Sequence, residues 1–364
     1  MHNPSMSGGQ GRGGSPGGAA DYFTKYYMNG PDNVGNEWLG EGTRRLGISD
    51  MAMSKRNVQK VLEGYHPRTG ERLVQNAGKD DRVFAIDCTL SAPKSVSVAY
   101  ALADKSTARA IMDAHNRAGD TAMSYMEKTY VRTRTGQAGA NKVQGKIIGF
   151  RSGHVTSRAG DPQLHIHNLV TGVTYGKGQT GAVDMKIILD NQKDVGRVYQ
   201  QALGRELRAV GVKVERDPEQ PFAIRVANID PEICRHFSSR SEEIAARAEA
   251  EGLVNPSAEQ KQYLAEWTRT PKPNEIDLIE RSSTWKVQAA GQGYKLPDLK
   301  ADMDRPWTRP VENVLDKVMG KAAEPADKDG ETRTNVPTEV RNDPTETVKE
   351  PAAERDVPDF DFDR

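Results

Sequence analysis

Three of the seven histidines lie within fourteen residues of one another: His154, His165 and His167. His165 and His167 are two positions apart, so on a β-strand their side chains point to the same face. The run 158–162 between the first and second histidine has the composition of a turn. If His154 pairs opposite either of the other two, all three imidazoles share a face, whereas a register one residue away puts His154 on the opposite face. Three imidazoles on one face are typical of a divalent-metal site with positions open for substrate. The alternative is three ordinary strand histidines.

Asp87 interrupts the short apolar run 83–90, which we expect to be a buried strand. A carboxylate inside such a strand costs free energy unless it is paired or hydrogen-bonded. One interpretation is a core aspartate whose hydrogen bonds are satisfied. The other is a carboxylate that orients a metal-binding imidazole and fixes which ring nitrogen carries the proton. The residues alone do not decide between the two.

Tyr22 and Tyr26 lie four positions apart in a cluster that also holds Phe23 and Tyr27. On an α-helix Tyr22 and Tyr26 share a face, while Tyr27 points elsewhere and suits packing in the core. A phenol has a pKa of about 10 in water, so it needs activation before it can act as a nucleophile. A metal site would position and polarise a phosphate for such an attack. The alternative is an aromatic cluster that fixes the first element of the fold.

Basic residues that could bind phosphate lie mainly around the predicted strands. Basic and aromatic side chains beside a groove are typical of proteins that bind single-stranded nucleic acid. Charged residues at strand edges are more often solvated, so the pattern by itself does not identify a substrate. The candidates for DNA binding are Lys94, Arg132, Arg134, Lys146, Arg151 and Arg158.

Strands and segregated helices must position these residues. Two long strands are expected over 142–157 and 163–175, next to the buried strand that carries Asp87. Segregated strands and helices suggest an α+β fold rather than a doubly wound one. Helices are expected over 95–103, 106–129, 194–210 and 231–251, followed by a helical C-terminal subregion.

Length and charge limit the class of protein. The 364 residues suggest two domains at most. Basic and acidic residues number 51 each, but residues 321–364 carry a net charge of −6 and the rest +6, which suits a polyanionic partner. Two cysteines exclude a disulfide scaffold and a Cys-rich zinc module. The sequence has no apolar run of the roughly 18–20 residues that span a membrane and no secretory signal, so we expect a cytoplasmic protein without membrane insertion.

Composition at the two ends predicts the domain organisation. Residues 1–18 are expected to form a flexible Gly-rich arm, because seven of the eleven residues from Gly8 to Gly18 are glycine. Residues 301–364 are expected to be a disordered, acidic, Pro-rich tail that cannot bury enough apolar surface to fold. A single folded domain is expected over 19–300.

The motifs, in this order, resemble conjugative relaxases of the MobF type, the TrwC/TraI class of HUH endonucleases. The run 164–168 with upstream His154 resembles the three-histidine motif of that family. Residues 87–97 resemble its Asp-bearing strand and the helix start that follows. Tyr22-Phe23 with Tyr26-Tyr27 resembles its double-tyrosine motif, and 38–42 is similar to the stretch behind it. The resemblance covers roughly residues 19–296.

The resemblance implies an antiparallel sheet with helices packed on it, the HUH or relaxase palm, plus C-terminal helical fingers that close over DNA. It implies a metal-dependent, site- and strand-specific enzyme that nicks and rejoins DNA at an origin of transfer in conjugation, through a 5′-phosphotyrosyl intermediate. The divalent metal, Mg²⁺ or Mn²⁺ with Zn²⁺ as the alternative, would bind His154, His165 and His167. Asp87 would assist, Tyr22 would cleave first and Tyr26 would act second.

The implied partners are single-stranded and hairpin DNA at the origin, a type IV secretion coupling protein and accessory DNA-binding proteins. The family further implies a bacterial cytoplasmic protein that is exported to the recipient with the DNA, and we expect a monomer. The sequence lacks the G-x-x-x-x-G-K-[ST] motif of nucleotide-driven motors, so we expect a relaxase without a helicase, either stand-alone or truncated.

Other functions fit some of the same residues. A three-histidine metal hydrolase would use metal-bound hydroxide and form no covalent intermediate. A rolling-circle replication initiator, or a non-catalytic protein that binds an origin, are further alternatives. A covalent protein–DNA adduct would separate the relaxase from the hydrolase and from the non-catalytic protein.

Overall fold

The computed structural model describes most of the chain between residues 18 and 299. The described residues are 18, 20–21, 23–30, 32–79, 82–135, 141–218, 220, 222–268, 278–296 and 298–299. Apart from Gly18, the expected arm lies outside this part, as do Tyr22 and the expected tail. Among the described residues no helix combines the length and the apolar character needed to cross a membrane.

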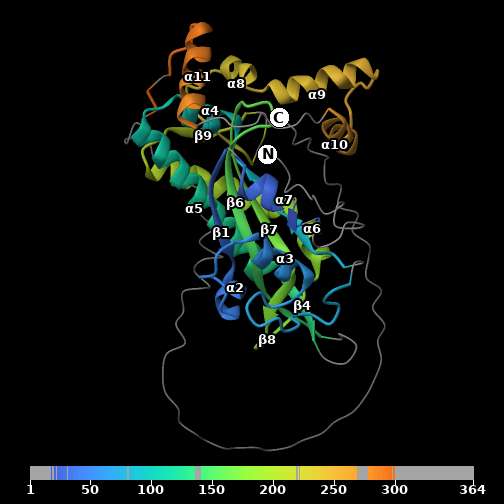
Figure 1. The fold of residues 1–364 in the computed structure, drawn as a ribbon. Helices are drawn as coiled ribbons and strands as arrows, with labels where there is room; N and C mark the ends of the chain where they lie inside the picture. Colours follow the sequence, from blue (N-terminus) through green and yellow to red (C-terminus); the bar gives the residue numbers. More distant parts are fainter. Residues whose placement is uncertain are drawn as a thin grey trace, which may run out of the picture. The chain divides into compact units, whose positions relative to one another are not determined.

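An antiparallel sheet forms the centre of the described region (Figure 1). Its main path runs β1-β6-β7-β2, with β3 and β8 also paired to β7. The strands span β1 Asn33–Leu39, β2 Ala85–Asp87, β3 Leu90–Ser91, β6 Lys146–Thr156, β7 Pro162–Gly176 and β8 Gln179–Ala182. The strand expected over 142–157 is divided at Gly145, so that β5 Asn141–Gln144 belongs to another sheet and only β6 pairs with β7. The hairpin of β6 and β7 occupies the middle of the sheet.

Alternation along β7 explains why this segment is a strand. Leu164 and Ile166 are almost fully buried on one face, and His165 and His167 are partly exposed on the other. The expected strand 83–90 is present as β2 and β3, which pair with β7 in one continuous register, Asp87 opposite Leu169 and Leu90 opposite Ile166. This register places the Asp87 strand directly beside the histidine strand.

Helices cover the apolar face of the sheet. The main ones are α4 Lys94–Leu102, α5 Lys105–Thr129 and α7 Gln192–Ala209, with α6 Met185–Asp190 beside them. They share one hydrophobic core with Ile86, Leu164 and Val170 of the sheet. Asp104 caps α5 by accepting the backbone N–H groups of Ser106 and Thr107. The result is the expected α+β architecture.

The other face of the sheet is covered by elements from the N-terminal part of the chain. These are α2 Glu41–Leu46, α3 Lys55–Glu63 and a π-helix, η2 Phe23–Met28. Phe23 and Tyr27 of the π-helix pack with Phe150 and Leu169, which lie on the same strand face as the histidines. The tyrosine segment therefore folds onto the histidine face.

Smaller elements complete the described region. Two hairpins lie off the main sheet, β4 Arg132–Thr135 with β5 Asn141–Gln144 and β9 Val214–Arg216 with β10 Ile224–Val226. The C-terminal helices are α8 Pro231–His236, α9 Ser239–Ala250, α10 Ala258–Trp267 and α11 Leu278–Gly291.

The single helix expected over 231–251 is wrong, because the chain forms α8 and α9 with a break at Phe237 and Ser238. Phe237 is buried, and the backbone N–H of Ser239 donates to the carboxylate of Asp161 at 2.9 Å. Nearby, the buried indole N–H of Trp285 in α11 donates to the Gly160 carbonyl at 3.0 Å. The C-terminal helices thus contact the turn that joins the two histidine-bearing strands.

Candidate functional site

The register of the central hairpin brings the three histidines together. His154 of β6 lies opposite His165 of β7, and Ser152 lies opposite His167. The centroids of the three imidazole rings are 5.0 to 5.3 Å apart. This is one of the two registers that put all three rings on one face, so the predicted clustering is observed.

Asp87 orients the ring of His167. Its Oδ2 lies 2.7 Å from His167 Nδ1, and the Thr89 hydroxyl lies 3.0 Å from the same nitrogen. Asp87 is 2% exposed. A carboxylate acceptor at Nδ1 holds the proton there and leaves Nε2 with a free lone pair. Asp87 therefore takes the orienting position that was one of its two interpretations.

His165 is oriented by the backbone of its own strand. Its Nδ1 lies 2.9 Å from the Gln163 carbonyl oxygen, so Nδ1–H donates and Nε2 is left as an acceptor. Burial lowers the pKa of His165 well below its usual value, and the neighbouring His167 and His154 lower the pKa further. This imidazole is therefore neutral at neutral pH, the form that can bind a cation.

His154 lies deepest in the cluster, with an exposed fraction of 1%. Its Nδ1 is 3.2 Å from Oδ1 of Asp32, and its Nε2 is 3.2 Å from the hydroxyl of Ser152. Asp32 is itself buried and accepts a hydrogen bond from the Thr156 hydroxyl at 2.7 Å. A second carboxylate thus stands beside the cluster, on the side opposite Asp87 in the strand order.

The donor set and its spacing fit a divalent cation. Three imidazoles bound tetrahedrally, with nitrogens about 2.0–2.1 Å from a metal, would have ring centroids roughly 5 Å apart. The observed separations match this value. As the rings stand, the described residues contain no group of three or more His, Cys, Asp or Glu side chains already set as ligands. The Ser152 contact at His154 Nε2 shows one ring that has to turn to complete such a set.

Tyr27 belongs to the site and not only to the core. Its ring stacks on the imidazole of His167, with centroids 4.0 Å apart and planes 18° apart. Its hydroxyl donates to Asp87 Oδ2 at 3.1 Å. Tyr27 is buried, as its expected core packing requires, but its polar end completes the contacts of Asp87. Nothing in the sequence pattern indicated this second role.

Of the two candidate nucleophiles, only the backbone of Tyr26 belongs to the described residues. Tyr22 and the side chain of Tyr26 lie outside the described residues. The backbone of Tyr26 belongs to the π-helix, so the expected α-helical geometry of this segment is wrong. Side chains of Asn33 and Ser152 bond the Tyr27 carbonyl, and Asn36 bonds that of Met28. These contacts hold the end of the tyrosine segment against β1 and β6.

Most of the basic residues predicted to bind DNA have partners within the protein. Arg151 pairs with both Glu37 and Asp120, Arg134 lies 3.6 Å from Asp184, and Lys146 lies 3.6 Å from Glu127. The Lys94 ammonium donates to the Pro162 carbonyl at 3.0 Å, and burial lowers its pKa to about 8. Arg132 lies on β4, and Arg158 in the turn before β7.

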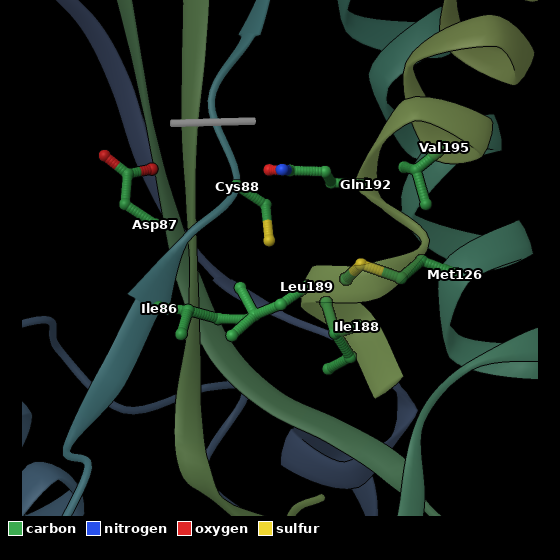
Figure 2. Close-up of a pocket in the computed structure, with 8 residues that line it drawn as sticks. All are labelled: Ile86, Asp87, Cys88, Met126, Ile188, Leu189, Gln192 and Val195. Carbon is green, nitrogen blue, oxygen red and sulfur yellow. The ribbon is translucent and has the colours of Figure 1, made fainter. Parts of the chain in front are cut away.

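A small apolar cavity lies behind the Asp87 strand, away from the histidines (Figure 2). In this view the Cys88 thiol points toward the cavity and the Asp87 carboxylate points away from it. Burial, and secondarily the charge of Asp87, raises the pKa of the Cys88 thiol, so the thiol stays protonated and unreactive. The cavity is lined by Ile86, Asp87, Cys88, Met126, Ile188, Leu189, Gln192 and Val195.

Four residues of the site carried no clear signal in the sequence: Asp32, Thr89, Ser152 and the hydroxyl of Tyr27. Thr89 could have been found from Asp87, because residues two apart share a strand face. Ser152 stands in the same relation to His154. Asp32 follows a Gly-Pro pair, which predicts a turn but gives no hint of a histidine partner.

Comparison with known proteins adds the family. The family model for TrwC relaxase matches residues 16–292. The multifunctional conjugation protein TraI of Escherichia coli is 28% identical over an alignment of 290 residues, and the match covers 72% of this chain and 16% of TraI. The TraI of Escherichia coli strain K12 matches to the same extent. The chain therefore spans only a small part of these curated relatives.

Two solved structures of the conjugative relaxase TrwC are also similar. The metal-bound complex with oriT DNA has a TM-score of 0.65 and 28% identity, covering 77% of this chain and 96% of that one. The complex with a 27-mer DNA comprising the recognition hairpin and the cleavage site has a TM-score of 0.64 and 27% identity, covering 77% and 95%. With more than half of its length matched by the family model, the chain belongs to the TrwC relaxase family.

Proposed function

We propose that this chain nicks and rejoins one DNA strand at an origin of transfer during conjugation. The observation that carries the proposal is the packing of the tyrosine segment on the histidine cluster. Tyr27 stacks on His167 and bonds Asp87, so the adjoining Tyr26 lies in a segment fixed to the same site. The related TrwC was solved in complex with oriT DNA, in metal-bound and metal-free forms.

In the proposed reaction a tyrosine oxygen attacks one phosphodiester. The phenol loses its proton, the bond from phosphorus to the 3′-oxygen breaks, and the leaving 3′-oxygen takes up a proton. The products are a 3′-hydroxyl and a 5′-phosphotyrosine, and attack by a 3′-hydroxyl reverses the step. Tyr22 is assigned the first cleavage and Tyr26 the second attack that ends transfer.

The protein groups around the site have distinct duties in this proposal. A divalent cation at His154, His165 and His167, Mg²⁺ or Mn²⁺ with Zn²⁺ as the alternative, would supply positive charge to the phosphate under attack. Asp87 accepts a hydrogen bond from Nδ1 of His167 and so would leave Nε2 of that ring for the cation. The His167 side chain keeps 15% of its surface exposed, and the phosphate would approach the cluster on this side.

DNA binding is proposed to draw on the positive charge of the chain outside its acidic end. Arg132 and Arg134 on β4, with Lys94, Lys146, Arg151 and Arg158, remain the proposed DNA contacts. Acidic partners offset part of the positive charge of Arg134, Lys146 and Arg151. These three side chains would therefore contribute less to DNA affinity than unpaired cations. The proposed substrate is the single strand with its hairpin, as in the DNA bound to TrwC.

The cellular setting is proposed from the family. The protein would act as a monomer in the bacterial cytoplasm, with accessory DNA-binding proteins at the origin and a type IV secretion coupling protein. It would then travel to the recipient with the DNA. Residues 19–300 would be the catalytic domain.

The test is formation of a covalent adduct. The protein is incubated with Mn²⁺ and single-stranded oligonucleotides from the intergenic region of its own operon, then run on a denaturing gel. We expect a shifted protein–DNA band that Tyr22→Phe abolishes and Tyr26→Phe retains. The reverse result would exchange the roles of the two tyrosines. An adduct that persists in the double variant would refute tyrosine chemistry here, and cleavage without any adduct would favour the metal hydrolase.

A further inference from the structure

Asp32 contacts the histidine cluster but has no role in the proposed reaction. It lies directly before β1, where Asn33 pairs with His154 of β6. Its side chain is 5% exposed, and the His154 side chain is fully buried. Oδ1 of Asp32 lies 3.2 Å from His154 Nδ1, and Oδ2 accepts the Thr156 hydroxyl at 2.7 Å.

The contacts of Asp32 resemble those of Asp87. Asp87 places Oδ2 at Nδ1 of His167 in a hydrogen bond of 2.7 Å, and Asp32 places Oδ1 near Nδ1 of His154 in an ion-pair contact of 3.2 Å that does not reach hydrogen-bond geometry. A hydroxyl donor supports each carboxylate, Thr156 for Asp32 and Tyr27 for Asp87. Carboxylates behind metal-binding imidazoles fix the ring tautomer and raise the basicity of the opposite nitrogen. With neutral imidazoles the two buried carboxylates give the site a charge of −2, which a divalent cation would balance.

We propose that Asp32 is a second positioning residue of the cation site, acting through His154. When Nε2 of His154 turns from Ser152 to the cation, Asp32 accepts Nδ1–H of the same ring and so fixes its tautomer. The proposal rests on the cation site of the proposed function. It adds to Asp87 an independent carboxylate on the opposite side of the cluster.

The contact between Ser152 and His154 does not prevent Nε2 of His154 from binding a cation. The Ser152 hydroxyl has other acceptors, the Tyr27 carbonyl and the Asn36 side-chain oxygen at 2.8 Å. When His154 Nε2 turns to a cation, Ser152 keeps a hydrogen-bond partner, so no buried donor is left unsatisfied. The exchange therefore costs little.

The experiment measures Mn²⁺ affinity by calorimetry in the full chain without DNA. We expect Asp32→Asn to weaken Mn²⁺ binding roughly 10–100-fold, the usual loss for a removed partner of a metal-binding imidazole. Thr156→Val, which leaves Asp32 in place but unsupported, should weaken it less. The matched control is Asp113→Asn, an exposed carboxylate on α5, which should bind within about two-fold of the wild type.

A second measurement follows the tautomer of His154 by ¹⁵N NMR in the metal-free protein. We expect the proton on Nδ1 in the wild type and a shift of proton population toward Nε2 in Asp32→Asn. Unchanged Mn²⁺ affinity together with an unchanged tautomer in a folded Asp32→Asn protein would overturn the proposal. Should that variant not fold, an unchanged affinity in Thr156→Val would overturn it instead.

The double variant His165→Ala plus His167→Ala distinguishes a failure of the Asp32 role from a failure of the cation site. If it abolishes Mn²⁺ binding while Asp32→Asn does not weaken it, only the role of Asp32 fails. If neither variant weakens Mn²⁺ binding, the cation site of the proposed function fails as well, and the role of Asp32 fails with it.

Discussion

At the scale of the residue, one oxygen atom organises much of the site. Oδ2 of Asp87 meets both the imidazole of His167 and the hydroxyl of Tyr27, and these two rings are stacked on each other. Its other oxygen is buried without a hydrogen-bond partner. A buried carboxylate oxygen without a partner costs free energy, so packing does not explain an aspartate at this position. The contacts of Oδ2 with the imidazole and the phenol explain it better.

We therefore predict that Asp87→Asn keeps the fold but weakens the site. The amide removes the negative charge and allows the wrong imidazole tautomer at His167, so Mn²⁺ affinity or adduct formation should fall roughly 10–100-fold. Calorimetry and the denaturing-gel assay measure the two quantities. Full nicking activity in a folded Asp87→Asn protein would contradict the orienting role, and the core interpretation would then hold.

At the scale of the element, the Trp38–Gly42 stretch shows why a motif can be structural. β1 ends at Leu39, and Gly40 then turns the chain into α2 with a φ of 95°. A Cβ at Gly42 would lie 2.5 Å from the Ile147 carbonyl oxygen of β6. The helix and the strand approach backbone to backbone, which only glycine permits. This contact positions the far end of the strand that carries His154.

Gly42→Ala should therefore destabilise the protein by roughly 1–3 kcal/mol, the range typical of overpacking against groups that cannot move. Gly291→Ala is the matched control, because its added Cβ at the end of α11 meets nothing within 4 Å. That variant should be as stable as the wild type or slightly more so. Urea unfolding measures both, and equal stabilities would refute the close-approach argument.

At the scale of the whole molecule, buried histidines link stability to pH. His115 of α5 is 1% exposed, with Nδ1 2.7 Å from the Tyr199 hydroxyl of α7. Burial, and secondarily the charge of Arg151, lowers the pKa of His115 to about 3. The unfolded chain takes up this proton near pH 6.5 and the folded chain does not. Stability must therefore fall as the pH drops below about 6.5, approaching 1.4 kcal/mol per pH unit for one proton. His165 acts in the same direction.

We predict that His115→Gln lowers the slope of unfolding free energy against pH between about 6.5 and 5. The decrease should reach up to about 1.4 kcal/mol per pH unit, the value for one proton. Tyr199→Phe is the control, since it removes the hydrogen bond but keeps the buried imidazole and hence the slope. Denaturant titrations at a series of pH values give the slopes. Identical slopes for His115→Gln and the wild type would show that the imidazole is not held neutral by burial.

Net charge gives a second prediction for the whole chain. Removing residues 321–364 removes a charge of −6, so the remainder should bind DNA at least as tightly, with a linear decrease of log affinity with log salt. Nicking should persist, because the acidic segment has too little apolar surface to position catalytic groups. Loss of the adduct in the truncated protein would contradict this expectation.

The sequence by itself determined the family, the α+β class and the residues of the histidine cluster. Strand periodicity of two residues fixes His165 and His167 on one face wherever the strand lies. The order of the tyrosine, aspartate and histidine motifs indicated the relaxase family, which the family model confirms. These are local or ordered properties of the chain, and they do not depend on which distant segments pack together.

The tertiary structure decided which partners each residue meets. The register opposite His154 could be set only by the whole sheet, because bulges in β1 and β6 shift the pairing. Asp32 contacts His154, Arg151 pairs with Asp120, and Asp161 accepts a hydrogen bond from the backbone N–H of Ser239. In each case the two residues are far apart in the sequence. Burial and ion pairing depend on these distant neighbours. For that reason the sequence named the imidazoles, and only the fold revealed the second carboxylate beside them.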